Sequence, residues 1–133
     1  MNDKRVDINK GNNNDKTPLW IACWNGYIEI VEYIFASGRE VNVHIKDNKG
    51  QTAIDIARKR ANRKKTSSET KERFQERIRR YEKIVELLES FERNPIETRF
   101  KLRLKLGLAG KIQFNFILLS FFSLSSNVSL FSR

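Results

Sequence analysis

Apolar residues recur at helical spacing in two short neighbouring stretches. The run LWIACW, residues 19–24, follows Thr17 and Pro18, which are typical of a helix start because a threonine hydroxyl accepts a backbone hydrogen bond and proline fits the first turn. Gly26 and Gly38 are expected to end the two helices, Gly26 in the left-handed conformation. The second stretch carries four apolar residues at helical spacing: Ile30, Val31, Ile34 and Phe35. The pattern predicts a hairpin of two short antiparallel helices.

The same pattern returns further along the chain. The segment NKGQTAIDIAR parallels NNDKTPLWIAC at an offset of 35 residues, so that Thr52 corresponds to Thr17. Ala57 corresponds to Ala22 in the same alignment. A helix-turn-helix unit that recurs with such a period is typical of a stacked solenoid. The sequence therefore predicts an all-α fold in which Thr17 and Thr52 each cap a first helix.

The two units resemble the ankyrin repeat. The first unit matches the family pattern T-P-L-H-x-A-A-x-x-G-H-x-E-I-V at eight positions: Thr17, Pro18, Leu19, Ala22, Gly26, Glu29, Ile30 and Val31. The lead-in D-x-x-G-x-T is matched at Asp47, Gly50 and Thr52, and Asn9 precedes Thr17 by eight residues as the family's V-N does. The resemblance covers about residues 6–57 and resumes at residues 84–91. It implies an ankyrin-type helix-turn-helix solenoid with finger loops.

Three departures from the family pattern lie in the loops and first helices. Trp20 takes the position of the family's histidine, which hydrogen-bonds back to the repeat's threonine. Asp55 holds that position in the second unit. Two extra residues lie between Asn42 and Thr52, so the second finger is expected to be longer than usual.

The largest departure is an insertion in the second unit. It adds 19 residues between Ala57 and Ile84, which aligns with Ile30. Thr66 and Glu69 match the capping box T-x-x-E, in which each residue satisfies a backbone N–H of the other. The insertion is therefore predicted to be helical.

An apolar seam predicts one continuous basic helix over about residues 67–92. The seam advances by steps of four and three residues: Phe74, Ile78, Tyr81, Val85 and Leu88. Two oppositely charged pairs stand four residues apart in the favourable order: Glu69 with Arg73, and Glu76 with Arg80. Only the part from about Tyr81 is expected to pack on the repeats. The first turns should then project and expose Phe74 and Ile78 to a second copy of the helix or to a partner.

Positive charge is concentrated in one part of the chain. Residues 58–83 hold 12 Lys and Arg against 4 Asp and Glu, which gives +8 of the net charge of +10. Such a segment suits an acidic protein, nucleic-acid phosphates or a membrane face, and ARKRANRKK is also typical of a nuclear-import signal; the alternative is a solvated, salt-bridged helix surface. Aromatic residues do not alternate with these charges along the sequence, which argues against specific nucleic-acid recognition. The expected basic patch consists of Arg63, Lys64, Lys65, Arg73, Arg77 and Arg80.

The sequence predicts no catalytic or metal-binding constellation. Cys23 and His44 are single residues of their types, so a Cys/His zinc site cannot be assembled, and Gly50 stands alone, so no phosphate-binding loop is present. Cys23 is expected to be buried filler and His44 a solvated loop residue. We expect a protein without catalytic activity, metal or cofactor. The opening MNDKRVDINKGNNN lacks the apolar core of a secretory signal, so an intracellular setting, cytoplasm or nucleus, is expected.

The resemblance implies that variable positions on a concave surface bind another protein. Mapped onto this chain, they are Asn13, Asn14, Lys16, Trp24, Asn25, Asn48, Lys49, Gln51, Lys59 and Arg60. Trp20 is expected to pack against its neighbours, whereas Trp24 either contacts a partner or covers the surface that a preceding repeat would use. The predicted function is a non-catalytic interaction module with an acidic protein partner and weak self-association. The alternative is an electrostatic tether, in which residues 58–83 bind anionic nucleic acid or membrane with a steeper salt dependence.

These patterns divide the chain into five segments. They are a disordered start (1–5), ankyrin-like repeats (6–65), a long basic amphipathic helix that completes the second repeat (66–93), a short basic helical segment begun by Asn94 and Pro95 (94–108) and an apolar Ser/Phe-rich tail outside the fold (109–133). Polar residues interrupt the tail, which leaves it short of the roughly 20 apolar residues of a membrane span. The tail is interpreted either as translated intron or as a weak membrane anchor, and the chain either as a whole product or as a fragment of a longer array.

Overall fold

The computed structural model describes residues 7–107. Within this range every element of regular secondary structure is a helix. The helices are α1 (Pro18–Asn25), α2 (Ile28–Ala36), α3 (Ala53–Ala61), α4 (Lys71–Arg93) and α5 (Pro95–Lys105). The predicted disordered start and the apolar tail, with its intron and membrane interpretations, lie outside the described residues. The other predicted segment boundaries stay predictions.

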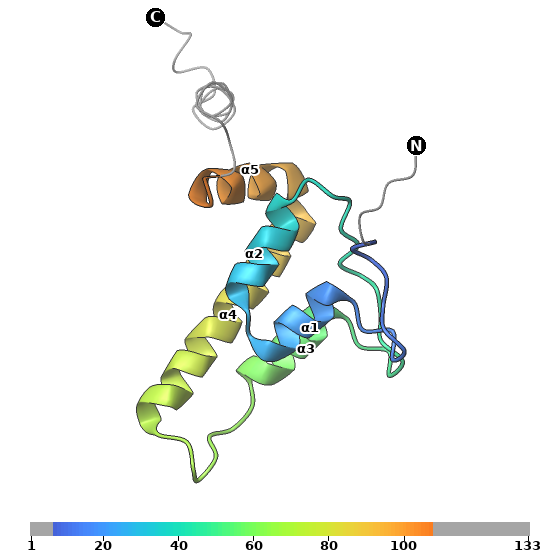
Figure 1. Cartoon of the computed structure of the whole chain (residues 1–133). Helices are drawn as coiled ribbons and strands as arrows, with labels where there is room; N and C mark the ends of the chain where they lie inside the picture. Colours follow the sequence, from blue (N-terminus) through green and yellow to red (C-terminus); the bar gives the residue numbers. More distant parts are fainter. Residues whose placement is uncertain (1–6, 108–133) are drawn as a thin grey trace, which may run out of the picture.

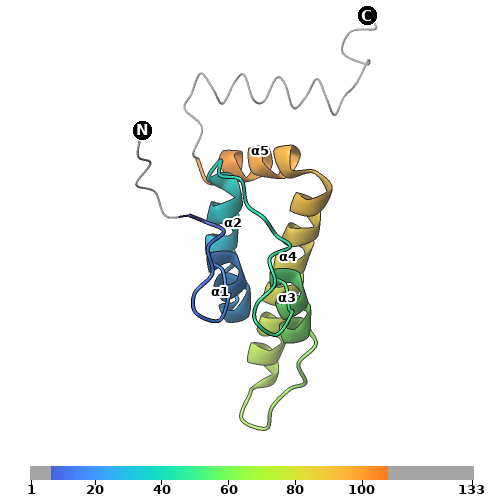
Figure 2. The same cartoon turned by 90° about the vertical axis from the view of Figure 1, so that its right-hand side faces the viewer.

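The helices form two layers that a fifth helix closes at one end. Helix α1 lies beside α3, α2 lies beside α4, and α5 crosses the ends of α2 and α4 (Figures 1 and 2). The two finger loops, which precede α1 and α3, run side by side at one edge. Phe35 of α2 and Phe91 of α4 stack at a ring-centroid distance of 4.0 Å in the core between the second helices. The predicted all-α, ankyrin-type solenoid is confirmed.

Both first helices begin at the predicted threonines. The Thr17 hydroxyl accepts a hydrogen bond from the N–H of Trp20, and the Thr52 hydroxyl accepts one from the N–H of Asp55. Asp55 also accepts hydrogen bonds from the Thr52 N–H and hydroxyl, at 2.9 and 2.8 Å. The carboxylate therefore makes the bond to the threonine that the family's histidine makes. Gly26 ends α1 in the left-handed conformation, as predicted, with φ 73°.

The two fingers repeat the same hydrogen-bonded turn. Asn12 accepts hydrogen bonds from the backbone N–H groups two and four residues later, and Asp47 does the same. Asn9 joins the fingers at their base, because its side chain donates to the carbonyl of Glu40 and accepts from the N–H of Asn42. The extra residues of the second finger lie between Asn42 and Asp47, so the turn at the tip keeps its length.

Helix α4 begins later than predicted and with a different cap. Thr70, and not Thr66, caps it by accepting a hydrogen bond from the N–H of Arg73. The Thr66 N–H donates to the Glu69 carboxylate at 3.5 Å, but the Glu69 N–H bonds to the main-chain oxygen of Thr66 instead of its hydroxyl, so only half of the predicted capping box is formed. Glu69 pairs with Arg77 and not with Arg73, whereas the predicted pair of Glu76 and Arg80 is present at 4.0 Å.

Burial shows which part of α4 serves as the second helix of the repeat. Ile84 is 0 % exposed and Ile30 is 47 % exposed, so the predicted equivalence of these two residues is wrong. The buried Val31 of α2 is the better counterpart of Ile84, which makes the insertion 18 residues long instead of 19. The buried residues of α4 begin at Tyr81, as predicted. The turns before it extend past the ends of α1 and α3 (Figures 1 and 2).

The predicted exposed stripe of Phe74 and Ile78 is wrong. Both side chains are half-buried, and the guanidinium of Arg77 lies over the Phe74 ring at 5.2 Å. The most exposed large apolar residues of the repeats are elsewhere, on α1, α2 and the turn between them: Ile21, Trp24, Tyr27, Ile30 and Tyr33.

Helix α5 starts as predicted and covers the C-terminal end of α2. Asn94 caps it, and Pro95 occupies its first turn. Two of its arginines donate to main-chain carbonyls at the end of α2: Arg99 to Phe35 at 3.3 Å and Arg103 to Ala36 at 2.9 Å. Lys105 pairs with the buried Glu32. Cations at a helix C-terminus satisfy its free carbonyls and its dipole, so α5 stabilises the end of α2.

We expect the fold to lose stability in acid. Hydrogen bonds from the N–H and hydroxyl of Thr52 hold the pKa of Asp55 below its usual 3.8. Burial raises the pKa of Asp47, but hydrogen bonds from the N–H groups of Gln51 and Lys49 outweigh this and keep it below 3.8. A lowered folded-state pKa stabilises the protein above the unfolded value, and this contribution is lost as the pH falls below 3.8.

Circular dichroism melts at decreasing pH measure this effect. The Tm should fall as the pH drops below 3.8, and Asp55→Asn should lower the Tm at neutral pH while making its acid dependence shallower. An equally steep acid dependence in Asp55→Asn would show that this carboxylate does not contribute.

A second stability test compares the two finger tips. Asp15 adopts φ 60° at the position where the second finger has Gly50, with φ 78°. Left-handed backbone strains residues that carry a Cβ, so Asp15→Gly should raise the free energy of unfolding by up to about 1 kcal/mol. Gly50→Ala should lower it by about 1 kcal/mol, because a Cβ there meets no atom within 4 Å and only the backbone is strained. Urea unfolding measures both, and a destabilised Asp15→Gly would refute the strain argument.

Candidate functional site

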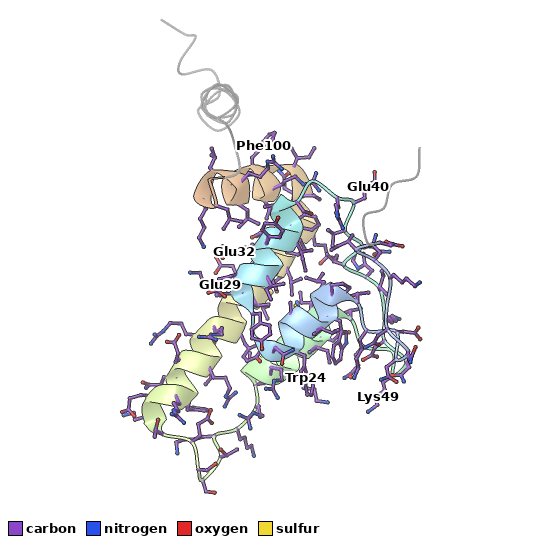
Figure 3. All side chains as sticks on the ribbon, in the orientation of Figure 1. Trp24, Glu29, Glu32, Glu40, Lys49 and Phe100 are labelled. Atoms are coloured by element: carbon purple, nitrogen blue, oxygen red, sulfur yellow. The ribbon has the colours of Figure 1, made fainter. Side chains whose placement is uncertain are left out.

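The structure brings the predicted partner-binding residues to one surface. They lie on the paired fingers (Asn13, Asn14, Lys16, Asn48, Lys49 and Gln51), on α1 (Trp24 and Asn25) and on α3 (Lys59 and Arg60). The backbone N–H of Asn48 donates to the carbonyl of Asn14 at 3.1 Å, which holds the finger tips together. Figure 3 shows Lys49 at the finger tips and Trp24 on α1. Lys16, Gln51 and Arg60 are half-buried, and the others are exposed.

Three of these side chains, Lys16, Trp24 and Arg60, form a stacked ladder with Trp20. The Trp20 and Trp24 rings stack at 5.5 Å with an interplanar angle of 9°. The Lys16 ammonium lies 4.5 Å from the centroid of Trp20, and the Arg60 guanidinium lies 4.8 Å from that of Trp24. Cations over aromatic faces are attracted by the ring quadrupole. The ladder therefore links the first finger to α3 through α1.

The ladder bears on two expectations from the sequence. Two stacked tryptophans lie between two cations in space, although aromatic and basic residues do not alternate along the chain. Trp20 is buried at 5 % exposure, as predicted, while Trp24 keeps 40 % of its surface exposed. The indole N–H of Trp20 has no hydrogen bond of good geometry, but it faces the Asp47 carboxylate and contributes to the lowered pKa of Asp47.

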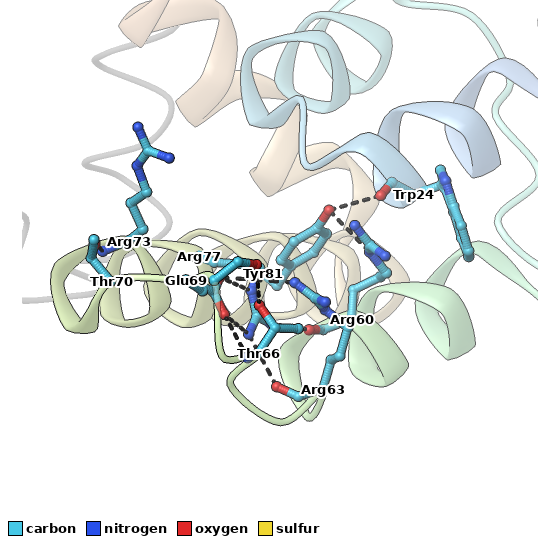
Figure 4. A network of polar contacts seen from close by, with 10 residues as sticks. Trp24, Arg60, Arg63, Thr66, Glu69, Thr70, Arg73, Arg77 and Tyr81 are labelled. Carbon is cyan, nitrogen blue, oxygen red and sulfur yellow. Dashed lines mark hydrogen bonds and ion pairs between the residues drawn. The ribbon is translucent and has the colours of Figure 1, made fainter.

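Arg60 is held in place by Tyr81 of α4. Its Nε donates to the Tyr81 hydroxyl at 3.4 Å, and its guanidinium lies 5.6 Å from the centroid of the Tyr81 ring. The Tyr81 hydroxyl in turn donates to the carbonyl of Trp24 at 2.7 Å (Figure 4). Tyr81 was predicted only as a core residue of the seam, because nothing local in the sequence indicates its contact with α1.

Arg77 is a structural residue and not part of the exposed basic patch, so its predicted role is wrong. Its side chain is 11 % exposed and pairs with Glu69 at 2.9 Å. It also donates to the main-chain carbonyls of Arg60 and Arg63, at 2.9 and 3.1 Å (Figure 4). The hydrogen bond from Arg77 lowers the pKa of Glu69. This guanidinium fastens the connection after α3 to the side of α4.

The remaining predicted basic residues are exposed in two groups. Arg63, Lys64 and Lys65 lie in the connection between α3 and α4. Arg73 and Arg80 lie on α4 and line a cleft of about 520 Å³ between the end of α1 and the first turns of α4. Arg60 lines the same cleft, so part of the basic patch adjoins the ladder.

The single cysteine and the single histidine form no reactive site. Cys23 is fully buried, and burial raises the pKa of its thiol to about 12. His44 is exposed as predicted, but its Nε2 lies 3.6 Å from the Glu92 carboxylate, a neighbour that the sequence did not indicate. Residues 7–107 contain no group of three or more His, Cys, Asp or Glu side chains placed to hold a metal ion. In the same range no helix has the length and apolar character needed to cross a membrane.

Stacked helical pairs with paired fingers define a helical repeat protein. Residues 1–57 match the family model for ankyrin repeats in many copies, and this part of the chain belongs to the ankyrin-repeat family. The match ends at Ala57, so α4 and α5 lie beyond it. Neither the curated proteins nor the solved structures gave a match.

Burial predicts that the Cys23 thiol is unreactive in the folded protein. The thiolate is the reactive form, and both a pKa of about 12 and the lack of solvent access suppress it. A thiol-reactive disulfide reagent at about pH 8 should modify the folded chain at least about 100-fold more slowly than the urea-unfolded chain. The Cys23→Ser variant is the blank, and equal rates in both states would show that the thiol is accessible.

Proposed function

We propose that this protein is a non-catalytic module that binds another protein through its fingers and the adjoining surface of α1 and α3. Ankyrin repeats generally mediate binding to other proteins and are typically not enzymes. The observation that carries the proposal is the ladder of Lys16, Trp20, Trp24 and Arg60, which holds the exposed Trp24 between Trp20 and Arg60. Tryptophan and arginine are the residues on which binding energy most often depends in protein interfaces.

The rigidity of this surface supports binding without a large entropic loss. Stacking fixes the Trp24 ring against Trp20, and a main-chain hydrogen bond from Asn48 to Asn14 joins the finger tips. A preorganised surface loses less conformational freedom on association than a flexible one. The proposal includes an acidic partner and an intracellular location in the cytoplasm or nucleus.

The electrostatic tether is a second candidate function. The connection between α3 and α4 carries Arg63, Lys64 and Lys65 on an exposed segment, and Lys64 and Lys65 have no acidic partner within residues 7–107. A tether of this kind binds anionic nucleic acid or membrane through charge alone, so its affinity falls steeply with salt.

Substitution of Trp24 tests the proposed function. Partners that co-purify with the tagged chain are identified by mass spectrometry, and the recombinant partner is then titrated by calorimetry. Trp24→Ala should weaken binding by at least about tenfold, because it removes the exposed ring. Tyr33→Ala is the matched control, since it removes another exposed aromatic from α2, outside this surface.

Salt and a triple variant separate the two functions. Binding that survives Trp24→Ala but disappears in Arg63→Gln/Lys64→Gln/Lys65→Gln, with a steep salt dependence, would support the tether and refute the proposed surface. Circular dichroism confirms that each variant is folded.

A further inference from the structure

The cleft beside the ladder exists because α4 is longer than an ordinary repeat helix. With 23 residues it is about 35 Å long, whereas α2 has 9 residues. Its first turns pass the end of α1 and form one wall of the cleft, while Asn25 and Arg60 form the other. The family match ends at residue 57, before the residues that form this wall.

Arg60 is set to bind a planar anion at this cleft. Its guanidinium stacks over Trp24, and its Nε is used by the Tyr81 hydroxyl. No carboxylate within residues 7–107 lies within ion-pair distance of Arg60. The N–H groups of its two terminal nitrogens can therefore donate to a ligand. A guanidinium fixed on an aromatic face presents these donors as a fork that matches a carboxylate.

The cleft retains positive charge after its internal pairs are counted. Glu69 neutralises Arg77, and Glu76 lies near Arg79 and Arg80. Arg73 lines the cleft and has no acidic partner within the described residues. In Figure 4 the Arg73 side chain extends from the start of α4 away from the Glu69–Arg77 pair. Glu72 also lines the cleft, so the lining holds four arginines and two glutamates, and the guanidinium groups without an acidic partner in the described part of the chain are those of Arg60 and Arg73.

We propose that this cleft binds an acidic segment of the protein partner, with Arg60 as the bidentate contact to one carboxylate and Arg73, further along the cleft, as a second cation for the segment. The inference rests on the proposed function, and it adds where the acidic segment binds and which residues bind it. Arg60 both lines this cleft and stacks on the exposed Trp24, so it joins the cleft to the ladder.

The surroundings favour a carboxylate over a nucleic acid. Glu72 and Glu76 also line the cleft, and they would repel a continuous phosphate backbone more than a single side chain. The stacked faces of Trp20 and Trp24 contact each other and the two cations, so a base would have to displace Arg60 before it could stack.

A labelled hexaglutamate peptide is the probe, and hexaglutamine is the uncharged control. Binding to the full chain is measured by fluorescence anisotropy in about 0.1 M salt. Arg60→Gln should raise the Kd about tenfold, and Arg60→Lys should raise it nearly as much because lysine keeps the charge but lacks the fork. Arg73→Gln should raise it about threefold, as expected for a single exposed cation.

The matched control is Lys83→Gln, which removes one positive charge from an exposed position of α4 outside the cleft. It should change the Kd less than about twofold. Equal losses in Arg60→Gln and Lys83→Gln would overturn the proposal, since binding would then follow net charge alone. Absence of hexaglutamate binding would overturn it as well. Tighter, Arg60-dependent binding of a 12-nucleotide oligothymidylate would overturn it in favour of nucleic acid.

This test is separable from that of the proposed function. If an identified partner binds more weakly to Trp24→Ala while hexaglutamate binds Arg60→Gln as well as the parent, the proposed interaction surface is supported and the carboxylate site is refuted. If hexaglutamate binding requires Arg60 while no partner depends on Trp24, the site stands and the finger surface fails.

Discussion

The contact between Tyr81 and the turn after α1 joins the long helix to the first repeat, and both the fold and the candidate site depend on it. The Tyr81 ring is 3 % exposed, and its hydroxyl donates to the carbonyl of Trp24. A Cβ at Gly26 would lie 3.1 Å from this ring, at a residue whose φ is already 73°. Only glycine meets both conditions without strain. The end of α1 and the first buried turn of α4 are therefore fixed together.

This contact explains how the second repeat tolerates a long insertion. The entropic cost of closing a loop grows slowly with its length. The added residues therefore destabilise the fold little if the helix that follows them is packed in place. Tyr81 holds it on one side, and the stacked Phe35 and Phe91 hold it further along. Arg77 donates to the carbonyl of Arg63 in the connection and to that of Arg60 at the end of α3, which ties both to the side of α4. The extra length then projects as an ordered wall.

The features that sequence could predict are those fixed by local chemistry. The threonine caps, the left-handed Gly26 and the buried Cys23 follow from a few neighbouring residues and the repeat period. The predictions of a Thr66 cap and of a Glu69–Arg73 pair were wrong. Both were read from spacing along the sequence, which does not show that main-chain carbonyls of another segment lie beside α4 and hold Arg77 next to Glu69. The predicted equivalence of Ile84 and Ile30 was wrong because the Ile-Val pair recurs in the sequence while its isoleucine is exposed in the first repeat and buried in the second.

The candidate site combines both kinds of information. Lys16, Trp24 and Arg60 were expected on one surface from the repeat alignment, but their ladder arises only because α1 and α3 lie side by side. Once Trp20 and Arg60 contact the Trp24 ring, a partner meets an indole edge and the outer nitrogens of a guanidinium instead of an open aromatic face. An edge and a fork are recognised by apolar and carboxylate groups held at a fixed separation.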